Sequence, residues 1–529
     1  MSDRLVLQGA TVIDGTGRSG FRGDVAISEG TITQVGANLA IEGGRVINIE
    51  GLTLAPGFID SHTHTDGAAF AFPLSESKLF QGVTSEVTGN CGIGFFPVND
   101  RYKRLLADYL RVHDFAMPAE MAWRDFAGYA GQLMQTGLGL NHVPLLGHGS
   151  LRIAVMGADD REPTTSEQAL MNSLLAASLE QGAWGISTGL IYPPGSFAKT
   201  SELISLACVC AERGAIYTSH IRGESATLMA AVEEAIEVGR QSRARVIISH
   251  LKALGRDNWG KGEMLLGKIE TARRNGVDVT ADQYPYEASS TSLTALVPAR
   301  FQAGGVTALL AALSDPDAKP ELVAAIEREM NVRGGPAKVM VTNLATSENA
   351  ALSGKTLAQI AALWGTDPAD TVINLLRAER GEVGAVFFSM SEQDVETIMR
   401  SKSVAIGSDG RGLKTGAGGE ATHPRSFGTF PRVLGKYVRE KRLLPLETAI
   451  YKMTGLTAQR FDIRDRGTIA AGKIADLVAF DPATITDMAD FGRPRQYSAG
   501  IKYLFIDGIQ VIADGRLTGN TAGKVLFKG

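Results

Sequence analysis

The sequence is poor in cysteine, which limits the ways in which the fold can be held together. Only three cysteines occur among 529 residues, Cys91, Cys208 and Cys210. Three are too few for a disulfide framework in a chain of this length, and unpaired thiols favour a reducing compartment, so we expect a cytoplasmic protein. Cys208 and Cys210 lie two residues apart on a predicted helix and face different directions, so we expect buried structural thiols there.

Basic clusters and long apolar stretches are also absent. The net charge of −4 is spread over many residues, and no Lys/Arg run or basic aromatic stripe marks a nucleic-acid or membrane surface. The opening segment MSDRLVLQGATVIDGTG lacks an apolar stretch of signal-peptide or transmembrane length. With 44% hydrophobic and 21% charged residues, the chain has material for a large core. We therefore expect a small-molecule partner, and neither nucleic acid nor membrane.

Both ends of the sequence have the pattern of β-strands. Residues 4–55 alternate apolar and polar positions, with Glu29-Gly30 as a turn signal. The C-terminal part repeats this pattern in GTIAAGKIADLVAF and YLFIDGIQVIADG, where Asp507-Gly508 suits a two-residue hairpin turn. We expect residues 1–55 and 462–529 to form one small β-sandwich domain.

Between the two ends, short apolar runs alternate with helix-length amphipathic segments, as parallel strands covered by helices do. The runs are LAPGFID (54–60), VTSEV (83–87), HVPLLG (142–147), AWGIST (183–188), AIYTS (215–219), RVIIS (245–249), GVDVTA (276–281) and SVAIGS (403–408). Eight repeats predict an α/β protein with a TIM (β/α)8 barrel over residues 56–461, whose catalytic groups follow the strands. Between Asp282 and Ser403 the spacing grows to ~120 residues, against ~30 for an ordinary unit. We expect an inserted lid subdomain there, at 287–400, before strand eight.

Metal-ligating residue types follow several of these runs. In His62-Thr63-His64 after the first run, alternate residues of an extended segment point to the same side, so both imidazoles can reach one ion. A lone loop histidine is usually not a ligand, but four of the eight histidines follow runs one, five and six. The candidate ligands are His62, His64, Cys91, His220, His250 and Asp409. Thiolate, imidazole and one carboxylate favour Zn²⁺ over Mg²⁺ or Ca²⁺, and bound zinc supplies the chemistry of amide hydrolysis.

Several longer segments resemble one known family. They are PGFIDSHTHTD (56–66), GVTSEVTGNCGIGFFP (82–97), GAWGISTGLIYPPG (182–195), YTSHIRGE (217–224), ISHLKALG (248–255), DQYPYEAS (282–289), GSDG (407–410) and HPRSFGTFPRVLG (423–435). Together they resemble the D-aminoacylase branch of the metal-dependent amidohydrolase superfamily. The first segment and GSDG are shared widely across that superfamily, whereas GNCGIGF, GLIYPPG and HIRGE are far more restrictive. The resemblance covers nearly the whole chain.

This resemblance implies an activity and a set of roles. The activity is zinc-dependent hydrolysis of N-acyl-D-amino acids to a carboxylate and a free D-amino acid, and the preference for the D-enantiomer rests on the resemblance alone. By resemblance, Cys91, His220 and His250 hold a tight zinc ion. His62, His64 and Asp409 surround a second, weaker position that Cys91 could bridge. The residues implied for binding the substrate α-carboxylate are Tyr192, Lys252, Tyr284, Ser289 and Arg425. A carboxylate beside the attacking water can also move its proton to the leaving amine, so Asp409 is the candidate catalytic residue.

The fourth run contains no lysine, and this absence bears on the choice between amidohydrolase classes. Many binuclear relatives bridge their metals there with a carboxylated lysine, but no lysine occurs between Lys103 and Lys199. The thiolate of Cys91 is the remaining anionic candidate. The absence argues against most cyclic-amide hydrolases, such as hydantoinases and dihydropyrimidinases, and against β-aspartyl dipeptidases, which remain the alternatives. A catalytically dead relative with a binding role is a further alternative, but all six candidate ligands are present.

The loop after GSDG, up to Thr422, is rich in glycine. Two cations of this loop, Arg411 and Lys414, could favour acidic substrate side chains such as those of D-glutamate or D-aspartate. For His113, His142 and His148 we expect scaffold roles. His148 follows the third run and therefore faces the same end of the predicted barrel as the candidate ligands.

Overall fold

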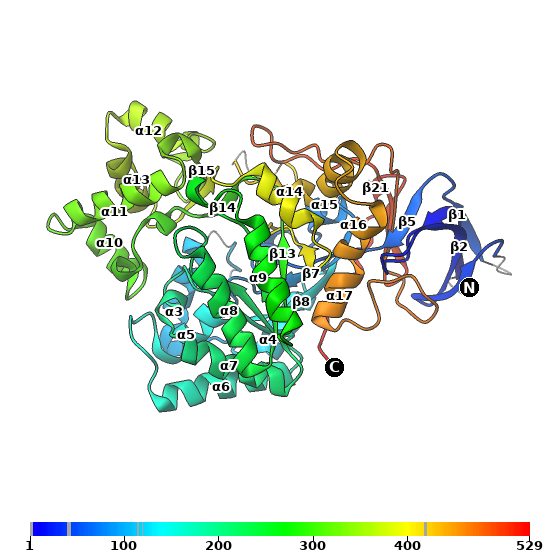
Figure 1. The fold of residues 1–529 in the computed structure, drawn as a ribbon, viewed down its shortest axis with the longest axis horizontal. Coiled ribbons are helices and arrows are strands. Elements are labelled where there is room, and N and C mark those ends of the chain that lie inside the picture. Colours follow the sequence, from blue (N-terminus) through cyan, green and yellow to red (C-terminus); the bar gives the residue numbers. More distant parts are fainter. Residues whose placement is uncertain (1–3, 40–43, 114–115, 119, 417–420) are drawn as a thin grey trace.

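The computed structural model describes residues 4–39, 44–113, 116–118, 120–416 and 421–529. Three assemblies make up the chain: a mixed sheet built from both chain ends, a set of parallel strands surrounded by helices, and an inserted unit with its own sheet. Figure 1 shows the mixed sheet at one end of the long axis, the parallel strands in the middle, and helices α10 to α13 of the insertion at the other end.

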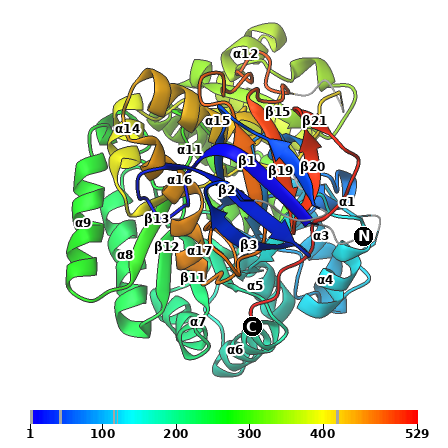
Figure 2. The same ribbon diagram turned by 90° about the vertical axis from the view of Figure 1, so that its right-hand side faces the viewer.

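The mixed sheet has nine strands and unites the two ends of the chain. Its strands are β1 (Arg4–Val12), β2 (Phe21–Ser28), β3 (Thr31–Gly36), β4 (Arg45–Asn48), β5 (Thr53–Pro56), β18 (Leu477–Phe480), β19 (Ile501–Ile506), β20 (Ile509–Ala513) and β21 (Arg516–Leu517). The two ends join where β5 pairs antiparallel with β18, and Figure 2 views the molecule from this side. Both predicted hairpin turns are present, with positive φ at Glu29-Gly30 and Asp507-Gly508, as type I′ turns require.

Each of the eight predicted apolar runs contains a strand, and these strands run parallel. They are β6 (Phe58–Asp60), β7 (Val83–Thr88), β8 (Asn141–Pro144) with its continuation β9 (Leu146–Gly147), β10 (Gly185–Gly189), β11 (Ile216–His220), β12 (Arg245–Ile248), β13 (Val279–Gln283) and β17 (Val404–Ile406). One sheet has the order β6-β7-β8, and the other β9-β10-β11-β12-β13-β17. The segments after β6 and β17 also meet, because the Thr63–Gly410 bridge is parallel and His64 N donates to Gly410 O at 2.9 Å. This arrangement of parallel strands is consistent with a barrel.

Helices cover the outer side of the parallel strands. They are α1 (Ala68–Ala71), α2 (Glu76–Leu79), α3 (Lys103–Val112), α4 (Phe126–Met134), α5 (His148–Met156), α6 (Thr165–Glu180), α7 (Thr200–Glu212), α8 (Leu228–Ser242), α9 (Gly262–Arg274), α14 (Glu392–Arg400), α15 (Arg425–Arg432), a π-helical segment (Val433–Glu440), α16 (Leu446–Met453) and α17 (Gly455–Phe461). Strong local signals fix some boundaries: α6 begins at a capping box in which Thr164 and Glu167 satisfy each other's backbone N–H groups. Among the described residues, no helix combines the length and apolar character needed to cross a bilayer.

The insertion between β13 and α14 is a separately packed unit. It contains β14 (Ser289–Ser292), α10 (Val306–Ser314), α11 (Lys319–Val332), β15 (Val339–Leu344), α12 (Leu357–Trp364), α13 (Pro368–Ala378) and β16 (Val383–Phe387). Its antiparallel sheet has the order β14-β16-β15 and shares an apolar core with the four helices, in which Leu322, Val372 and Leu376 are buried. The unit contacts the helices around the parallel strands where Gly304 N donates to Ala158 O at 2.9 Å.

Candidate active site

The predicted metal ligands lie where the parallel strands end. His62 follows β6, Cys91 follows β7, and His220 is the last residue of β11. His250 follows β12, and Asp409 follows β17. Carboxyl ends of neighbouring parallel strands meet at one edge, which brings residues far apart in sequence together. All five side chains are buried.

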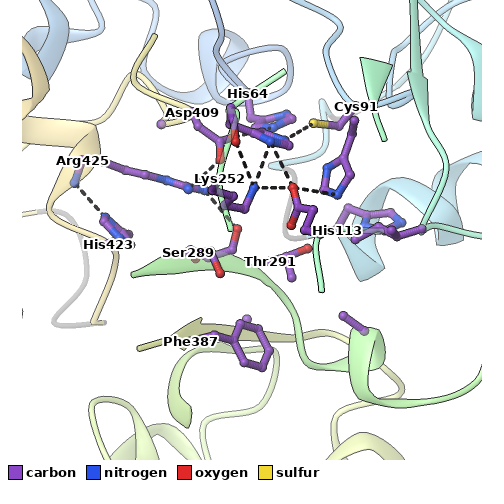
Figure 3. A pocket seen from close by; sticks show the side chains of 18 of the residues that line it. His64, Cys91, His113, Lys252, Ser289, Thr291, Phe387, Asp409, His423 and Arg425 are labelled. Carbon is purple, nitrogen blue, oxygen red and sulfur yellow. Dashed lines mark hydrogen bonds and ion pairs between the residues drawn. The ribbon is translucent and has the colours of Figure 1, made fainter. Parts of the chain in front are cut away.

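Four of these residues form one compact group. The Sγ of Cys91 lies 3.4 Å from His62 Nε2 and 3.5 Å from His250 Nε2. Asp409 Oδ1 lies 3.5 Å from His62 Nε2. One ligand atom from each of the four lies within 4.8 Å of the others, so one ion could contact them all. His64 adjoins the group, with its Nε2 3.0 Å from Asp409 Oδ1 (Figure 3).

A second group shares His250 with the first. It consists of His220, Glu224 and His250, with His220 Nε2 3.6 Å from Glu224 Oε1 and the two imidazole centroids 4.4 Å apart. The grouping differs from the expected set of Cys91, His220 and His250, because Glu224 takes part in it. Neither ring nitrogen of buried His220 makes a hydrogen bond to the described residues. Buried polar atoms normally have a partner, so this pair of nitrogens suits a metal ligand.

The backbone is unusual at three of these positions. Cys91, His250 and Asp409 have φ angles of 54°, 37° and 52°, in the left-handed region that few residues other than glycine adopt. Residues held in such conformations cluster at functional sites, where the surrounding structure over-determines them. Asp282 supplies part of that restraint, because its Oδ1 accepts from His250 N at 2.6 Å and its Oδ2 lies 3.4 Å from His62 Nδ1.

The electrostatics of the cluster suit a soft divalent cation. Burial raises the pKa of the Cys91 thiol, but the imidazoles of His62 and His250 lower it well below its usual value. Burial likewise raises the pKa of Asp409, and Arg425 lowers it well below the ordinary range. The pKa of His220 is lowered by burial, which favours its neutral form, whereas the neighbouring thiolate and carboxylates raise the pKa of His62, His64 and His250 in spite of their burial. Thiolate, carboxylate and neutral imidazole are together the donor set that zinc prefers.

Four of the five predicted substrate-binding residues line the pocket above the cluster. They are Tyr192, Lys252, Ser289 and Arg425. The fifth, Tyr284, lies behind Lys252 in an adjoining pocket, with the Lys252 Nζ 5.7 Å and the Arg425 Cζ 5.0 Å from its ring centroid. Tyr192 connects to the insertion, since its hydroxyl lies 2.8 Å from Thr291 Oγ1.

Lys252 and Arg425 each already contact a carboxylate of the chain. Arg425 Nη1 donates to Asp409 Oδ2 at 2.6 Å, and its Nη2 donates to Ser290 O at 3.0 Å. Lys252 Nζ donates to Glu224 and lies 2.9 Å from His250 Nδ1. A bound carboxylate would therefore share each cation with an acidic residue of the chain.

Sequence reasoning missed several residues of the site. Glu224 stands in the HIRGE segment, four residues after His220, and Asp282 directly follows the seventh apolar run, so both carried a signal that was not used. His113, expected to be structural, lines the pocket, and its ring centroid lies 4.7 Å from that of Tyr192. Burial lowers the pKa of His113 to about 3, so its ring is neutral. The wall formed by Thr291 and Phe387 of the insertion had no sequence signal.

The two cations expected to select acidic side chains occupy different places. Arg411 lines the pocket, and its Nη2 donates to the backbone oxygen of His113 at 3.2 Å. Lys414 does not line the pocket, and its Nζ lies 5.8 Å from the ring centroid of Phe72. Residues 417–420 of the same loop lie outside the described residues. His148 makes a buried contact of 2.7 Å between its Nε2 and Glu202 Oε1, as a scaffold residue would.

Comparisons with known proteins place this site in a family. Residues 45–516 match the amidohydrolase family. The chain is 39% identical to N-acyl-D-glutamate deacylase and 37% identical to D-aminoacylase, both from Alcaligenes xylosoxydans xylosoxydans; the alignments cover 96% and 99% of this chain, and 93% and 97% of the relatives. A crystal structure of N-acyl-D-glutamate deacylase from Bordetella bronchiseptica, complexed with zinc and a phosphonate mimic of the tetrahedral intermediate, superposes with a TM-score of 0.83 at 34% identity over 99% of both chains. The chain therefore belongs to the amidohydrolase family.

Proposed function

We propose that this protein hydrolyses the amide bond of N-acyl-D-amino acids, releasing a carboxylate and a free D-amino acid. The observation that carries the proposal is the buried cluster of thiolate, imidazoles and carboxylate beside Lys252 and Arg425. The cluster provides ligands for a hydrolytic metal ion, and the two cations suit the α-carboxylate of an amino acid. The preference for the D-enantiomer comes from the names of the relatives.

The cofactor in this proposal is Zn²⁺, with one tight site and a second, weaker one. Cys91, His220 and His250 would hold the tight ion, and His62, His64 and Asp409 would surround the weaker position with Cys91 as the bridge. Glu224 is close enough to His220 and His250 to contribute to the tight site. When bound, zinc acidifies water and polarises the carbonyl under attack. β10 corresponds to the fourth run, where many binuclear relatives have a bridging lysine, and it contains no lysine.

The catalytic residue in this proposal is Asp409. Its ionised carboxylate lies at the metal-ligand cluster, where it would accept a proton from the attacking water and deliver it to the leaving amine, while the contact with Arg425 lowers its pKa and thus its basicity. Lys252 and Arg425 would bind the α-carboxylate together with Tyr192, Tyr284 and Ser289. Arg425 would then link the substrate to Asp409, because its Nη1 already contacts that side chain.

The proposed architecture around this site is a closed TIM barrel. The Thr63–Gly410 bridge and the bond from Asp409 N to His62 O at 2.8 Å connect the last strand to the first, which supports closure. We assign residues 56–461 to the barrel and 287–400 to an insertion that acts as a lid. Residues 1–55 and 462–529 then form the small β-sandwich domain. A cytoplasmic location is supported by the three unpaired thiols.

The direct test is hydrolysis of paired N-acetyl-D- and N-acetyl-L-amino acids, with bound zinc measured on the same sample. We expect turnover of the D-enantiomer, at least one zinc per chain, and loss of activity when a chelator removes the metal. Hydantoin serves as the competing substrate. Turnover of hydantoin without turnover of N-acetyl-D-methionine would reject the proposal in favour of a cyclic-amide hydrolase.

A further inference from the structure

A second, apolar pocket adjoins the active-site pocket. It lies between the helices around the parallel strands and the insertion. Half of the residues that line it are large side chains of three helices: Leu105, Tyr109 and Val112 of α3, Ile153 of α5, and Val306 and Leu309 of α10. None of the described residues that line it carries a charge, whereas the active-site pocket is lined by Glu224, Lys252, Asp409 and Arg425.

The two pockets share one wall residue, His113. A row of aromatic rings leads from the metal-ligand cluster to the apolar pocket: the centroids of His220 and Tyr192 lie 5.1 Å apart, those of Tyr192 and His113 4.7 Å, and those of His113 and Tyr109 4.8 Å. Among the described residues, Tyr192 and His113 thus form part of the wall between the metal-ligand cluster and the apolar pocket.

The direction of a bound substrate follows from the positions of the charges. Figure 3 shows Arg425 and His423 on one side of the cluster, with Cys91 and His113 on the other. In an N-acyl amino acid, the α-carboxylate and the acyl chain leave the amide group in opposite directions. A substrate whose carboxylate contacts Arg425 thus points its acyl chain towards His113 and the apolar pocket.

We propose that this pocket is a subsite for an extended hydrocarbon acyl chain, so that the preferred substrates are D-amino acids N-acylated with chains of several carbons rather than with acetyl alone. The inference rests on the proposed function and adds the class of acyl group to it. His113 forms the wall that the two pockets share, and burial lowers the pKa of its ring to about 3, so the ring adds no charge where a hydrocarbon chain would pass it. Burying one methylene group is worth ~0.8 kcal/mol, or about fourfold in kcat/KM.

The first test is a chain-length series of N-acetyl, N-butanoyl and N-hexanoyl derivatives of one D-amino acid, assayed with the zinc-loaded enzyme. We expect kcat/KM to rise by about tenfold or more from acetyl to hexanoyl. A value that is flat or falls with chain length overturns the subsite but leaves the proposed function intact, because acetyl turnover alone supports the latter. Absence of turnover for every derivative rejects the proposed function itself.

A variant that fills the pocket localises the effect. Val306 is partly exposed at the start of α10, so Val306→Phe should reduce the space without disrupting the core. We expect the ratio of hexanoyl to acetyl kcat/KM to fall about tenfold. The matched control is Val323→Phe, a partly buried valine of α11 that lines neither pocket, which should leave the ratio unchanged. Equal ratios in the two variants would count against the assignment.

Equilibrium binding gives a readout that does not depend on turnover. Titration calorimetry with hexanoate and with acetate compares the two carboxylate products directly. We expect hexanoate to bind at least tenfold more tightly to the wild-type protein, with most of that difference lost in Val306→Phe. Equal affinity of the two carboxylates for the wild-type protein overturns the proposal even if no derivative is hydrolysed.

Discussion

The strand-end cluster and the insertion both line the active-site pocket, but they contribute different kinds of residues to it. At the strand ends, Cys91, His250 and Asp409 are buried in uncommon backbone conformations and within a few ångströms of one another. The insertion contributes mainly neutral wall residues such as Thr291 and Phe387, which stand on a separate sheet with a separate core. The difference indicates that the candidate metal ligands depend on the parallel strands, while the insertion adds a separately packed, mainly neutral part of the pocket wall.

The largest expected effect is at the thiolate of the cluster. Cys91→Ala should lower kcat/KM by about 10⁴-fold and remove most of the bound zinc, because a ligand and the main negative charge of the site are lost. Metal analysis and steady-state kinetics on one sample measure both. The matched control is Cys208→Ala, which removes a thiol of α7 that is not a candidate ligand. This variant should change neither kcat/KM nor the zinc content. If Cys91→Ala keeps its zinc and its activity, the chemistry does not depend on the strand-end cluster.

The next largest effect separates proton transfer from metal binding. Asp409→Asn keeps the size of the side chain but removes the proton acceptor, so kcat should fall by about 10²- to 10³-fold. The zinc content of the tight site should stay near that of the wild type, since Asp409 is proposed to belong to the weaker position. Loss of both metal ions together with activity would assign this carboxylate a purely metal-binding role.

A smaller effect is expected where a residue acts through the ligands. Asp282→Asn weakens the contacts that orient His250 and His62 without removing a proposed ligand. Zinc affinity should fall by about 10- to 100-fold, as is typical when such supporting partners are lost. Competition with a chelator of known affinity measures the change, and excess zinc should restore most of the activity. An unchanged zinc affinity would show that the strand ends orient His250 without the contacts of Asp282.

Damage to the core of the insertion should lower the stability of that unit without changing the metal site. Leu376 is fully buried on α13 and lines no part of the active-site pocket. Leu376→Ala should destabilise the unit locally by ~2–5 kcal/mol. Hydrogen exchange should then accelerate in α10 to α13 but not in β11 to β13, with zinc content unchanged. Acceleration in both regions would mean that the two units unfold together.

The smallest effect concerns the loop after β17. Lys414 lies over Phe72 and away from the pocket, so Lys414→Ala should leave the relative kcat/KM for N-acetyl-D-glutamate and N-acetyl-D-leucine within about twofold of the wild type. A larger loss for the glutamate derivative would restore the expectation from sequence that this lysine selects acidic side chains. The same two substrates also measure directly whether the enzyme prefers an acidic side chain.

The strand-end positions of the candidate ligands could be predicted from sequence because their signals are local. Each follows a short apolar run, and parallel strands carry such residues to a common edge whatever their separation along the chain. His62, Cys91 and His250 were placed in this way. The internal topology of the insertion could not be predicted, because the order β14-β16-β15 depends on pairing between distant segments.

The missed residues depended on contacts that no local pattern encodes. Glu224 gains its role from Lys252, 28 residues further on, whose ammonium group it meets in the pocket. His113 follows a helix like many surface histidines, and only the tertiary fold brings its ring against Tyr192. Arg411 and Lys414 were both candidates for favouring acidic side chains, and only the tertiary fold separates them: Arg411 lines the pocket, whereas Lys414 is exposed near the ring of Phe72.

The pairing of β5 with β18 also has a consequence for biosynthesis. The partner of residues 53–56 is residues 477–480, which are synthesised only after all of the parallel strands and the insertion. At ~5–20 residues per second, the N-terminal strands wait roughly 20 to 80 s with an unpaired sheet edge. Exposed edges are templates for aggregation. Nascent chains stalled shortly before residue 477 should therefore associate with chaperones more strongly than chains stalled after residue 517.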